Sequence, residues 1–441
     1  MQTNYTKVAK NSQIKVGLIS ADVVGRKMAG PGMRYFELAS ALACDFSVFL
    51  FAPDSCDLSA NGFKIITYNS KKSSSDLAKK ISDLNVIIAQ NLRPPLLSDI
   101  KKLKIKFIAD LYDPLLIEVL EYAKDDNEKL RNATFDFNYF SLLLQLATAD
   151  HLLCASDRQR DYYCGILSGR QILNPNFYNA SPNLEKFITI APFGLLSEKP
   201  KAKDPEAFYK KFPAIKKTDK IIYWGGGIWN WFDPISVIKA VEILAKKRDD
   251  IKLFFLGAKH PNPKIKKMRM ANEAISYAKE KGLIDKFVFF NYDWTPYDER
   301  TNYLCQSAIG ISTHFDNTET RFSFRTRVLD YFWADLPMIL TRGDYFAELC
   351  EKRNLGVVVD YKNSKEIAAA AEKIVNDEKF RSEIIKNISE VKKNFYWKSI
   401  AENIAKIIKK DRFAERKISR YEFWRLTFHF YKAGLKKKLA K

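Results

Sequence analysis

The residues best suited to chemistry lie in the second half of the chain, beginning with a glycine-rich loop after the apolar run Lys220–Trp224. The loop contains Gly225, Gly226 and Gly227, followed by Trp229, Asn230 and Trp231. Three consecutive glycines leave the backbone without a Cβ, so a phosphate or a sugar can approach it closely. The alternative is a tight turn between a strand and a helix, but such a turn rarely needs three glycines followed by two tryptophans. We therefore interpret this segment as a ligand-binding loop.

A second stretch, Glu319–Tyr331, places three arginines where a loop enters a predicted helix. They are Arg321, Arg325 and Arg327. Positive charge at the start of a helix opposes the helix dipole, and this cost is normally avoided unless an anion binds there. The pattern therefore predicts an anion site. The alternative is a surface ion-pair network that ties these arginines to Glu319 and Asp330.

Aromatic and histidine residues also follow other predicted strands of this half. His260, Trp294 and His314 each lie in a loop after an apolar run. Ligands of open parallel sheets bind at the carboxyl ends of the strands, so these loops should share one rim with the glycine loop. Such a rim suits a base, a ribose and phosphates. Taken singly, the two histidines can equally be satisfied structural residues, and Trp294 can simply pack its loop.

Two series of short apolar runs, separated by helical patterns, must position these loops. This alternation predicts an α/β protein with two parallel, Rossmann-like sheets. The first series has runs at Val16–Ser20, Ser47–Ala52, Val86–Gln90, Lys106–Asp110, His151–Ser156 and Phe187–Pro192, and helices at Met33–Ala43, Ser73–Asp83 and Leu115–Leu146, the last long enough for two. The second has runs at Lys220–Trp224, Lys252–Gly257, Lys286–Phe290, Ile309–Thr313, Pro337–Thr341 and Gly356–Asp360, and helices near Pro234–Arg248, Lys264–Lys281, Arg325–Ala334 and Ser364–Asp377.

The length of 441 residues exceeds what one core usually serves, which favours two domains of roughly 200 residues. The stretch Lys199–Lys220 is rich in Pro, Lys and Asp and is typical of a solvated linker with a short helix. We therefore expect an N-terminal domain, a linker, a C-terminal domain and basic C-terminal helices, at residues 1–198, 199–219, 220–395 and 396–441.

Composition narrows the class of protein. With 46% hydrophobic and 28% charged residues, the chain can bury a core and keep a solvated surface. Residues 1–13 lack the apolar core of a signal peptide, and no later run approaches the ~20 apolar residues of a spanning helix, which predicts a cytoplasmic location. The six cysteines form no Cys-x-x-Cys pair, so we expect mostly buried thiols and no zinc site. The net charge of +21 draws the protein toward anions without naming one.

The C-terminal segment 409–441 is strongly basic, with twelve Lys or Arg and three acidic residues, a net charge of 12 − 3 = +9. Apolar side chains recur there at helical spacing and basic ones lie on another face: Trp424, Phe428, Tyr431, Leu435 and Leu439, and Arg425, Lys432 and Lys436. A basic amphipathic helix suits an anionic membrane surface, so peripheral attachment to the inner face of the membrane is one expectation. The other is a helix that packs back across the N-terminal domain with a solvated basic face.

The stretch Leu329–Pro337 supports a family resemblance. It resembles the helix that ends the Glu-x7-Glu motif of retaining family-4 glycosyltransferases, which have the GT-B fold of two Rossmann-like domains facing a central cleft. Asp330 matches the second acid of that motif, and the first would fall at Phe322. In the family the first acid is associated with the donor sugar and the second with the ribose. The resemblance therefore implies ribose binding by Asp330, with Glu319 as an alternative first acid.

The N-terminal half is similar to the acceptor domain of the same family. Ser20–Gly32 resembles its glycine-bearing loop after the first strand, with Gly30-Pro31-Gly32 leading into the helix, which makes Gly30, Gly32 and Arg34 acceptor-side residues. Asp110 and Asp113 lie where members often have a His-Asp pair near the reaction centre, so they are candidate catalytic residues, although either can cap the following helix. Trp294–Arg300 and the glycine loop resemble a bacterial branch that acts in surface-polysaccharide assembly, such as O-antigen or capsule.

These patterns predict a glycosyltransferase that moves a sugar from a nucleotide-sugar donor to a glycan or lipid-linked acceptor, with retention implied by the resemblance. Such an enzyme must stabilise negative charge on the departing diphosphate. The chain has no Asp-x-Asp motif to hold a divalent metal, so Arg325, Arg327 and the glycine N–H groups are the expected stabilisers, and no metal or other cofactor is expected. The donor-binding residues are expected to be Gly225, Gly226, Gly227, Trp229, Asn230, Trp231, His260, Trp294, His314, Glu319, Arg321 and Asp330.

Two other functions remain open at this point. Sugar-nucleotide epimerases and phosphorylases share the two-domain architecture, and a fold does not fix a function. Detection of sugar transfer rather than epimer formation separates them. A nucleic-acid-binding protein is motivated only by the charge of +21, and no helix-turn-helix, zinc-finger or RNA-binding-sheet signature stands out in the sequence. We therefore expect no nucleic-acid partner.

Overall fold

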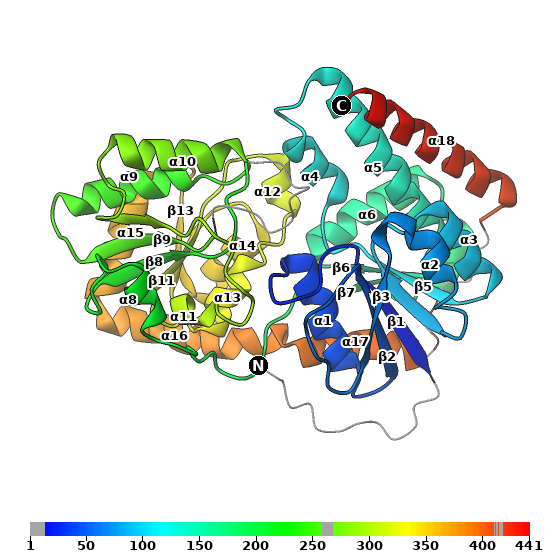
Figure 1. Cartoon of the computed structure of the whole chain (residues 1–441), viewed down its shortest axis with the longest axis horizontal. Helices are drawn as coiled ribbons and strands as arrows, with labels where there is room; N and C mark the ends of the chain where they lie inside the picture. The colour runs from blue at the N-terminus through cyan, green and yellow to red at the C-terminus, as the bar shows by residue number, and fades with distance from the viewer. Residues whose placement is uncertain (1–13, 258–267, 410, 412, 414–417) are drawn as a thin grey trace. The chain divides into compact units, whose positions relative to one another are not determined.

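The protein is described by a computed structural model that covers residues 14–257, 268–409, 411, 413 and 418–441. The chain forms two compact units, Met1–Phe193 with Trp397–Lys441, and Gly194–Tyr396. Each unit contains one parallel sheet with helices around it (Figure 1). The predicted α/β class with two parallel sheets is confirmed.

The unit boundaries differ from those expected from composition. The division falls between Phe193 and Gly194 rather than after residue 198. Residues 199–219, expected as a linker, belong to the second unit, because Phe208 of α8 (Ala207–Lys211) is fully buried in it. The basic C-terminal helices belong to the first unit. Composition indicates where a chain is polar, but only packing decides which core it joins.

The first unit has a seven-stranded sheet in the order β3-β2-β1-β4-β5-β6-β7, with every neighbouring pair parallel. Its strands are β1 (Lys15–Ile19), β2 (Ser47–Pro53), β3 (Lys64–Tyr68), β4 (Val86–Ala89), β5 (Lys106–Asp110), β6 (His151–Cys154) and β7 (Ile188–Ile190). Its helices are α1 (Gly30–Leu42), α2 (Ser73–Ala78), α3 (Pro94–Lys102), α4 (Leu115–Tyr122), α5 (Glu128–Thr148), α6 (Asp157–Gly169), α7 (Pro175–Ala180), α17 (Trp397–Lys409) and α18 (Arg420–Leu439). The run Leu115–Leu146 is two helices, as its length indicated.

The second unit has a six-stranded parallel sheet in the order β10-β9-β8-β11-β12-β13. Its strands are β8 (Lys220–Trp224), β9 (Ile251–Phe255), β10 (Val288–Phe290), β11 (Ile309–Ser312), β12 (Met338–Thr341) and β13 (Gly356–Val359). Besides α8, its helices are α9 (Pro234–Ala245), α10 (Arg269–Glu280), α11 (Thr301–Leu304), α12 (Thr318–Phe322), α13 (Arg327–Trp333), α14 (Tyr345–Arg353), α15 (Ser364–Asn376) and α16 (Glu378–Val391).

Burial explains why most strands could be recognised. The central strands are covered on both faces, so every residue of β4, β9 and β11 is buried and the sequence is mostly apolar, with Lys252 and Ser312 as the polar exceptions. The edge strand β3 is different, because four of its five residues are exposed or partly exposed, and it was missed. Within the described residues, no helix is long and apolar enough to cross a membrane.

Candidate functional site

The sheet of the second unit changes its winding direction between β8 and β11. The chain adds β9 and β10 on one side of β8, and then β11, β12 and β13 on the other. The loops after two neighbouring strands diverge at such a point, and ligands of open α/β sheets bind there. The loops after β8 and β11 are joined here, since Asp233 N–H donates to Thr313 O at 3.0 Å and Phe315 N–H to Trp231 O at 3.3 Å.

The glycine loop lies at this point, and a tyrosine that the sequence analysis missed fixes its start. Gly225 N–H donates to Tyr331 Oη at 3.1 Å, and Tyr331 Oη donates to Ile311 O at 2.7 Å. The Gly225 amide is therefore already engaged and is a poor candidate for binding a phosphate. A Cβ at Gly310 would lie 2.3 Å from the Tyr331 ring, so β11 needs glycine there. Gly226 has a φ of +79° and an empty position for a Cβ, which leaves its backbone open.

The tryptophans after the glycines pack against each other. The rings of Trp229 and Trp231 stack with centroids 5.2 Å apart and planes 6° apart. Trp231 is buried, whereas Trp229 is only partly buried. Asn230 is buried as well and accepts a hydrogen bond from Met270 N–H at 3.1 Å. Asn230 and Trp231 thus hold the loop in place, and Trp229 is the member of this group that keeps an accessible surface.

Arg327 lies beside this loop with an incomplete set of contacts. Its guanidinium lies over the rings of Phe232 and Trp224, at 3.9 and 4.8 Å from their centroids. Nη2 donates to Gly227 O at 2.8 Å, whereas Nη1 is buried and has no hydrogen-bond partner among the described residues. Burial lowers the pKa of Arg327 to about 10. A buried guanidinium nitrogen without an acceptor is a ready contact for an anion.

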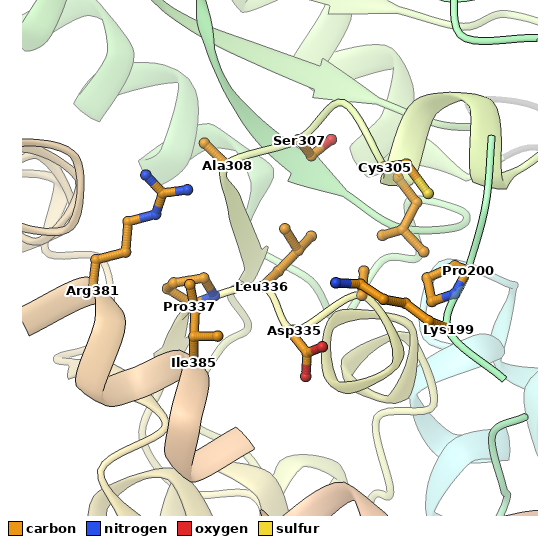
Figure 2. Close-up of a pocket in the computed structure, with 12 residues that line it drawn as sticks. Lys199, Pro200, Cys305, Ser307, Ala308, Asp335, Leu336, Pro337, Arg381 and Ile385 are labelled. Carbon is orange, nitrogen blue, oxygen red and sulfur yellow. The ribbon is translucent and has the colours of Figure 1, made fainter. Parts of the chain in front are cut away.

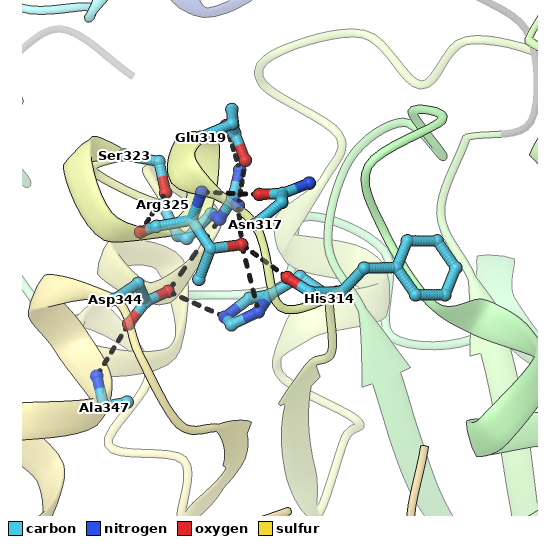
Figure 3. Close-up of polar contacts among 9 residues, drawn as sticks. His314, Asn317, Glu319, Ser323, Arg325, Asp344 and Ala347 are labelled. Atoms are coloured by element: carbon cyan, nitrogen blue, oxygen red, sulfur yellow. Dashed lines mark hydrogen bonds and ion pairs between the residues drawn. The ribbon is translucent and has the colours of Figure 1, made fainter. Parts of the chain in front are cut away.

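Arg325 and Glu319 form a buried pair instead of facing a ligand (Figure 3). Nη1 and Nη2 of Arg325 donate to the two carboxylate oxygens of Glu319 at 2.8 and 2.6 Å. The expected roles of Arg325 as a charge stabiliser and of Glu319 as a donor contact therefore need revision, because each group uses its charge on the other. The ion-pair alternative is closer to the structure for these two residues, but the pair lies in the interior and not on the surface.

His314 is part of the same buried cluster. Its Nε2 lies 3.3 Å from Asp344 Oδ2, and its Nδ1 lies 3.5 Å from Thr320 Oγ1 (Figure 3). Asp344 also caps α14 by accepting from Ala347 N–H at 2.7 Å. Burial would raise the pKa of Asp344, but His314 and Arg325 lower it below its ordinary value. These contacts give His314 a structural role in linking the loops after β11 and β12, although its buried Nε2 makes no hydrogen bond of regular geometry among the described residues.

The arginine-rich stretch is two helices rather than one loop that enters a helix. Arg321 is in α12, is 59% exposed and lies 3.5 Å from Glu348. Only Arg327 is at the start of α13. Asp330 lies one turn further along, with Oδ1 at 3.4 Å from Nη2 of Arg300, a residue not singled out from the sequence. Burial raises the pKa of Asp330, although Arg300 lowers it.

Two further expected donor residues follow β9 and β10. Trp294 lies against the end of β9, because a Cβ at Gly257 would meet its ring at 3.5 Å. This contact supports the packing interpretation for Trp294. His260 lies outside the described residues.

The expected acceptor-side residues form a buried network in the first unit. Arg34 is in α1 and is fully buried. Its Nε and Nη2 each donate to an oxygen of Asp110 at 2.7 Å, and its remaining bonds go to the carbonyls of Ala191 and Pro192. Burial would lower the pKa of Arg34, but Asp110 raises it above its ordinary value. Asp110 is therefore a positioning residue and not a free catalytic carboxylate.

Asp113 keeps the properties of a titratable site residue. Burial, together with the neighbouring Asp110, raises the pKa of Asp113 to about 7. Its backbone carbonyl accepts a hydrogen bond from Tyr163 Oη. Gly30 and Gly32, expected in the loop before the helix, are in the first turn of α1. Gly32 is required by packing, since a Cβ there would lie 2.1 Å from Val23 O, whereas the Cβ position at Gly30 is open.

A cavity of about 300 Å³ lies elsewhere in the second unit (Figure 2). Ala308 and Pro337, which line it, directly precede β11 and β12, so it lies at the amino ends of these strands. Lys199, Cys305, Asp335 and Arg381 add polar groups to its wall. Because the glycine loop and Arg327 are at the opposite ends of the strands, this cavity is separate from the candidate site.

The chain is similar to known proteins in one domain and in its fold. Residues 206–391 match the family described as glycosyl transferases group 1, whereas a search of curated proteins found no match. Among solved structures, the chain is similar to sucrose-phosphate synthase from Thermosynechococcus elongatus, with 14% identity, a TM-score of 0.61 and coverage of 90% of this chain and 98% of that one.

Two more solved structures resemble the chain over nearly its whole length. HepE from Anabaena, in complex with UDP-glucose, has 11% identity and a TM-score of 0.61, with coverage of 90% of this chain and 100% of HepE. WaaG, a glycosyltransferase involved in lipopolysaccharide biosynthesis, has 14% identity and a TM-score of 0.61, with coverage of 89% and 99%. The fold is therefore of the GT-B type. The protein is a glycosyltransferase whose second unit carries a glycosyl transferases group 1 domain.

Proposed function

We propose that the second unit binds the diphosphate of a sugar-nucleotide donor at the carboxyl ends of β8 and β11. The observation that carries this proposal is Nη1 of Arg327, which is buried beside the glycine loop and has no acceptor among the residues that the structure describes. A charged group taken out of water is costly unless it is paired. A phosphate oxygen would supply the missing acceptor, and the contact would strengthen as the leaving diphosphate gains charge.

Neighbouring groups support the same ligand. Gly226 has an open backbone next to Arg327's partner Gly227, and Trp229 is only partly buried, so it can contact the donor. Asp330 is one helical turn from Arg327, so both can address one ligand, and its carboxylate is the candidate acceptor for the ribose hydroxyls. HepE, which was solved with UDP-glucose, has the same fold and supports a nucleotide-sugar donor.

The reaction proposed is transfer of the sugar to a glycan or lipid-linked acceptor with retention of configuration, as in family-4 glycosyltransferases. Attack on the face from which the diphosphate departs needs no enzymic nucleophile. Arg327 stabilises the leaving group without a metal, and Asp113, with a pKa of about 7, is the acceptor-side candidate for receiving a proton. The similarity to WaaG and the resemblance of Trp294–Arg300 favour a role in surface-polysaccharide assembly on the cytoplasmic side of a membrane.

The test is a ligand panel measured by thermal shift. Sugars linked to UDP, GDP, dTDP or ADP are added to the wild type, to Arg327→Ala and to Arg321→Ala. A ligand that binds only the folded state raises the melting temperature. We expect one nucleotide class to stabilise the wild type and Arg321→Ala, a matched control because Arg321 is exposed and paired with Glu348. Equal stabilisation of Arg327→Ala would contradict the proposed site.

A further inference from the structure

Helix α18 has two apolar faces, and only one of them is packed. Phe423, Leu426 and Phe430 belong to the hydrophobic core of the first unit. Phe430 lies against Phe137 of α5 with ring centroids 4.8 Å apart, and His429 stacks on Phe140 at 5.0 Å. Figure 1 shows α18, in red, alongside α5. The packing alternative from the sequence is therefore correct for this face, and the helix is fixed in place before any partner arrives.

The opposite face exposes large apolar side chains in one stripe. Six of the eleven large hydrophobic side chains that the described residues expose are on α18: Tyr421 (76%), Trp424 (66%), Phe428 (64%), Tyr431 (53%), Leu435 (60%) and Leu439 (71%). At 3.6 residues per turn, they fall within an arc of about 80° over a length of about 27 Å. Scattered exposed hydrophobics are ordinary, but a continuous stripe of this kind marks an interaction surface.

Basic residues line both edges of this stripe. On the same helical wheel, Arg425, Lys432 and Lys436 follow one edge, and Arg420 and Lys438 the other. Residues 420–441 hold seven Lys or Arg and one acid, a net charge of 7 − 1 = +6. The acid, Glu422, is already paired with Arg425 at 2.7 Å. The surface is thus apolar in the middle and cationic at its margins.

We propose that this face of α18 docks on an anionic lipid bilayer, with the stripe Tyr421–Leu439 in the interface and the flanking lysines and arginines at the headgroups. Trp and Tyr favour the boundary between headgroups and acyl chains, and long basic side chains can reach the headgroups from beside them. A second copy of the chain is a poorer occupant, because a two-fold contact would bring two cationic margins together.

The docking extends the proposed function only in one respect, since it would hold the enzyme next to a lipid-linked acceptor. Docking requires no sugar-nucleotide donor, so it is tested without one.

The stripe variant is Trp424→Gln with Phe428→Gln and Leu435→Gln, which keeps good helix formers on an exposed face. The margin variant is Lys432→Gln with Lys436→Gln and Lys438→Gln. The matched control is Leu120→Gln with Tyr178→Gln, two exposed apolar residues of the same unit outside α18.

The full-length proteins are sedimented with vesicles of phosphatidylcholine alone or mixed with phosphatidylserine. We expect wild type and control to pellet with the anionic vesicles, the stripe variant to lose at least tenfold in the ratio of bound to free protein, and the margin variant to lose its preference for anionic lipid. Melting temperatures establish that all variants fold. Unchanged pelleting of the stripe variant overturns the proposal. A second outcome also overturns it: the wild type does not bind vesicles, and light scattering shows that the wild type is a dimer whereas the stripe variant is a monomer. The donor panel gives its own answer in either case, so the two proposals fail separately.

Discussion

Two arginines, Arg34 of the first unit and Arg327 of the second, lie near strand ends and differ in how completely they are paired. Arg34 directs all three of its guanidinium nitrogens to acceptors, namely both oxygens of Asp110 and two backbone carbonyls. Arg327 has one bond, to Gly227 O, and leaves Nη1 buried without a partner among the described residues. A saturated arginine holds a scaffold together, whereas an unsaturated one can bind something else. The difference separates residues that the sequence alone had grouped as site candidates.

The acids follow the same distinction. Asp110 and Glu319 each give both carboxylate oxygens to one arginine, at 2.6–2.8 Å. Among the described residues, Asp330 has a single, longer contact of 3.4 Å with Arg300, and its side chain is 25% exposed. By this measure Asp330 remains available to a ligand, while Asp110 and Glu319 do not. Mutations of paired and unpaired groups should therefore affect different quantities, stability for the first and catalysis for the second.

The largest effect is expected for Arg34→Ala. Removal of this side chain leaves Asp110 buried and uncompensated, which should lower the free energy of unfolding of the first unit by ~3–5 kcal/mol. Urea unfolding measures the change. The double variant Arg34→Met with Asp110→Leu, which removes both charges, should be clearly more stable than Arg34→Ala. A double variant as unstable as the single one would mean that lost packing, and not the unpaired carboxylate, causes the effect.

The commitment of Arg34 to Asp110 leaves Asp113 without a full counter-charge, and its pKa rises to about 7. In the unfolded chain this carboxyl ionises near pH 4. Between these values the folded state binds more protons, so stability should fall as pH rises from about 4 to 7 and stay level above. Relative to Asp113→Asn, whose side chain cannot ionise, the free energy of unfolding of the wild type should fall by at most about 4 kcal/mol between pH 4 and 7. A pH-independent difference between the two would show that folding does not raise the pKa of Asp113.

These pairings mark the limit of what the sequence could predict. The carboxyl-end rule located the glycine loop and His314, because a strand such as β8 is a short apolar run bounded by turn residues, and its predicted bounds, Lys220–Trp224, agree with the structure. The rule predicts which loops lie at the carboxyl edge of the sheet, but it does not predict which side chains from different loops and helices pair there. Arg34 and Asp110 are 76 positions apart, and nothing in either local pattern connects them.

The missed elements have a similar cause. Tyr331 fixes Gly225 from 106 positions away, and its ring requires glycine at position 310, a match that exists only after folding. The edge strand β3 has too little burial to produce an apolar run. In α18 the spacing of the sequence revealed one apolar face, which is exposed in the structure. The core covers a second apolar face of the same helix, which includes Phe423 and Phe430.

For Arg327→Ala the comparison predicts the reverse of Arg34→Ala. Its stability should change by no more than about 1 kcal/mol, because no buried acid loses a partner. Its kcat/KM should fall roughly ten- to a hundredfold, which corresponds to a loss of ~1.5–3 kcal/mol of transition-state stabilisation. The fall should be mainly in kcat, because the contact between Arg327 and the diphosphate strengthens as charge develops on the diphosphate. Arg321→Ala is the control and should keep wild-type kinetics. A strongly destabilised Arg327→Ala with normal turnover after correction for unfolded protein would place Arg327 in the scaffold.

A smaller effect is expected at Asp330, where Arg300→Ala provides the matched variant. Both substitutions break the 3.4 Å contact between the two side chains, but only Asp330→Ala removes an acceptor for the ribose hydroxyls. We expect a donor KM about tenfold higher, ~1.4 kcal/mol, for Asp330→Ala and a much smaller change for Arg300→Ala. Equal rises in KM would indicate that the ion pair itself, and not a ribose contact, is what the donor site needs.

The smallest effect is expected from removal of divalent metal. If Arg327 supplies the positive charge that the departing diphosphate requires, a metal held by an Asp-x-Asp motif is unnecessary, and the sequence contains no such motif. Turnover in EDTA should therefore stay within about twofold of the untreated enzyme, since the arginine contact does not depend on metal. Loss of activity in EDTA, with recovery on addition of Mg²⁺ or Mn²⁺, would contradict this. The Arg327→Ala variant sharpens the test. Added Mg²⁺ should not restore its turnover. Recovery would show that a metal can occupy the position of the guanidinium and that Nη1 of Arg327 is not the essential charge.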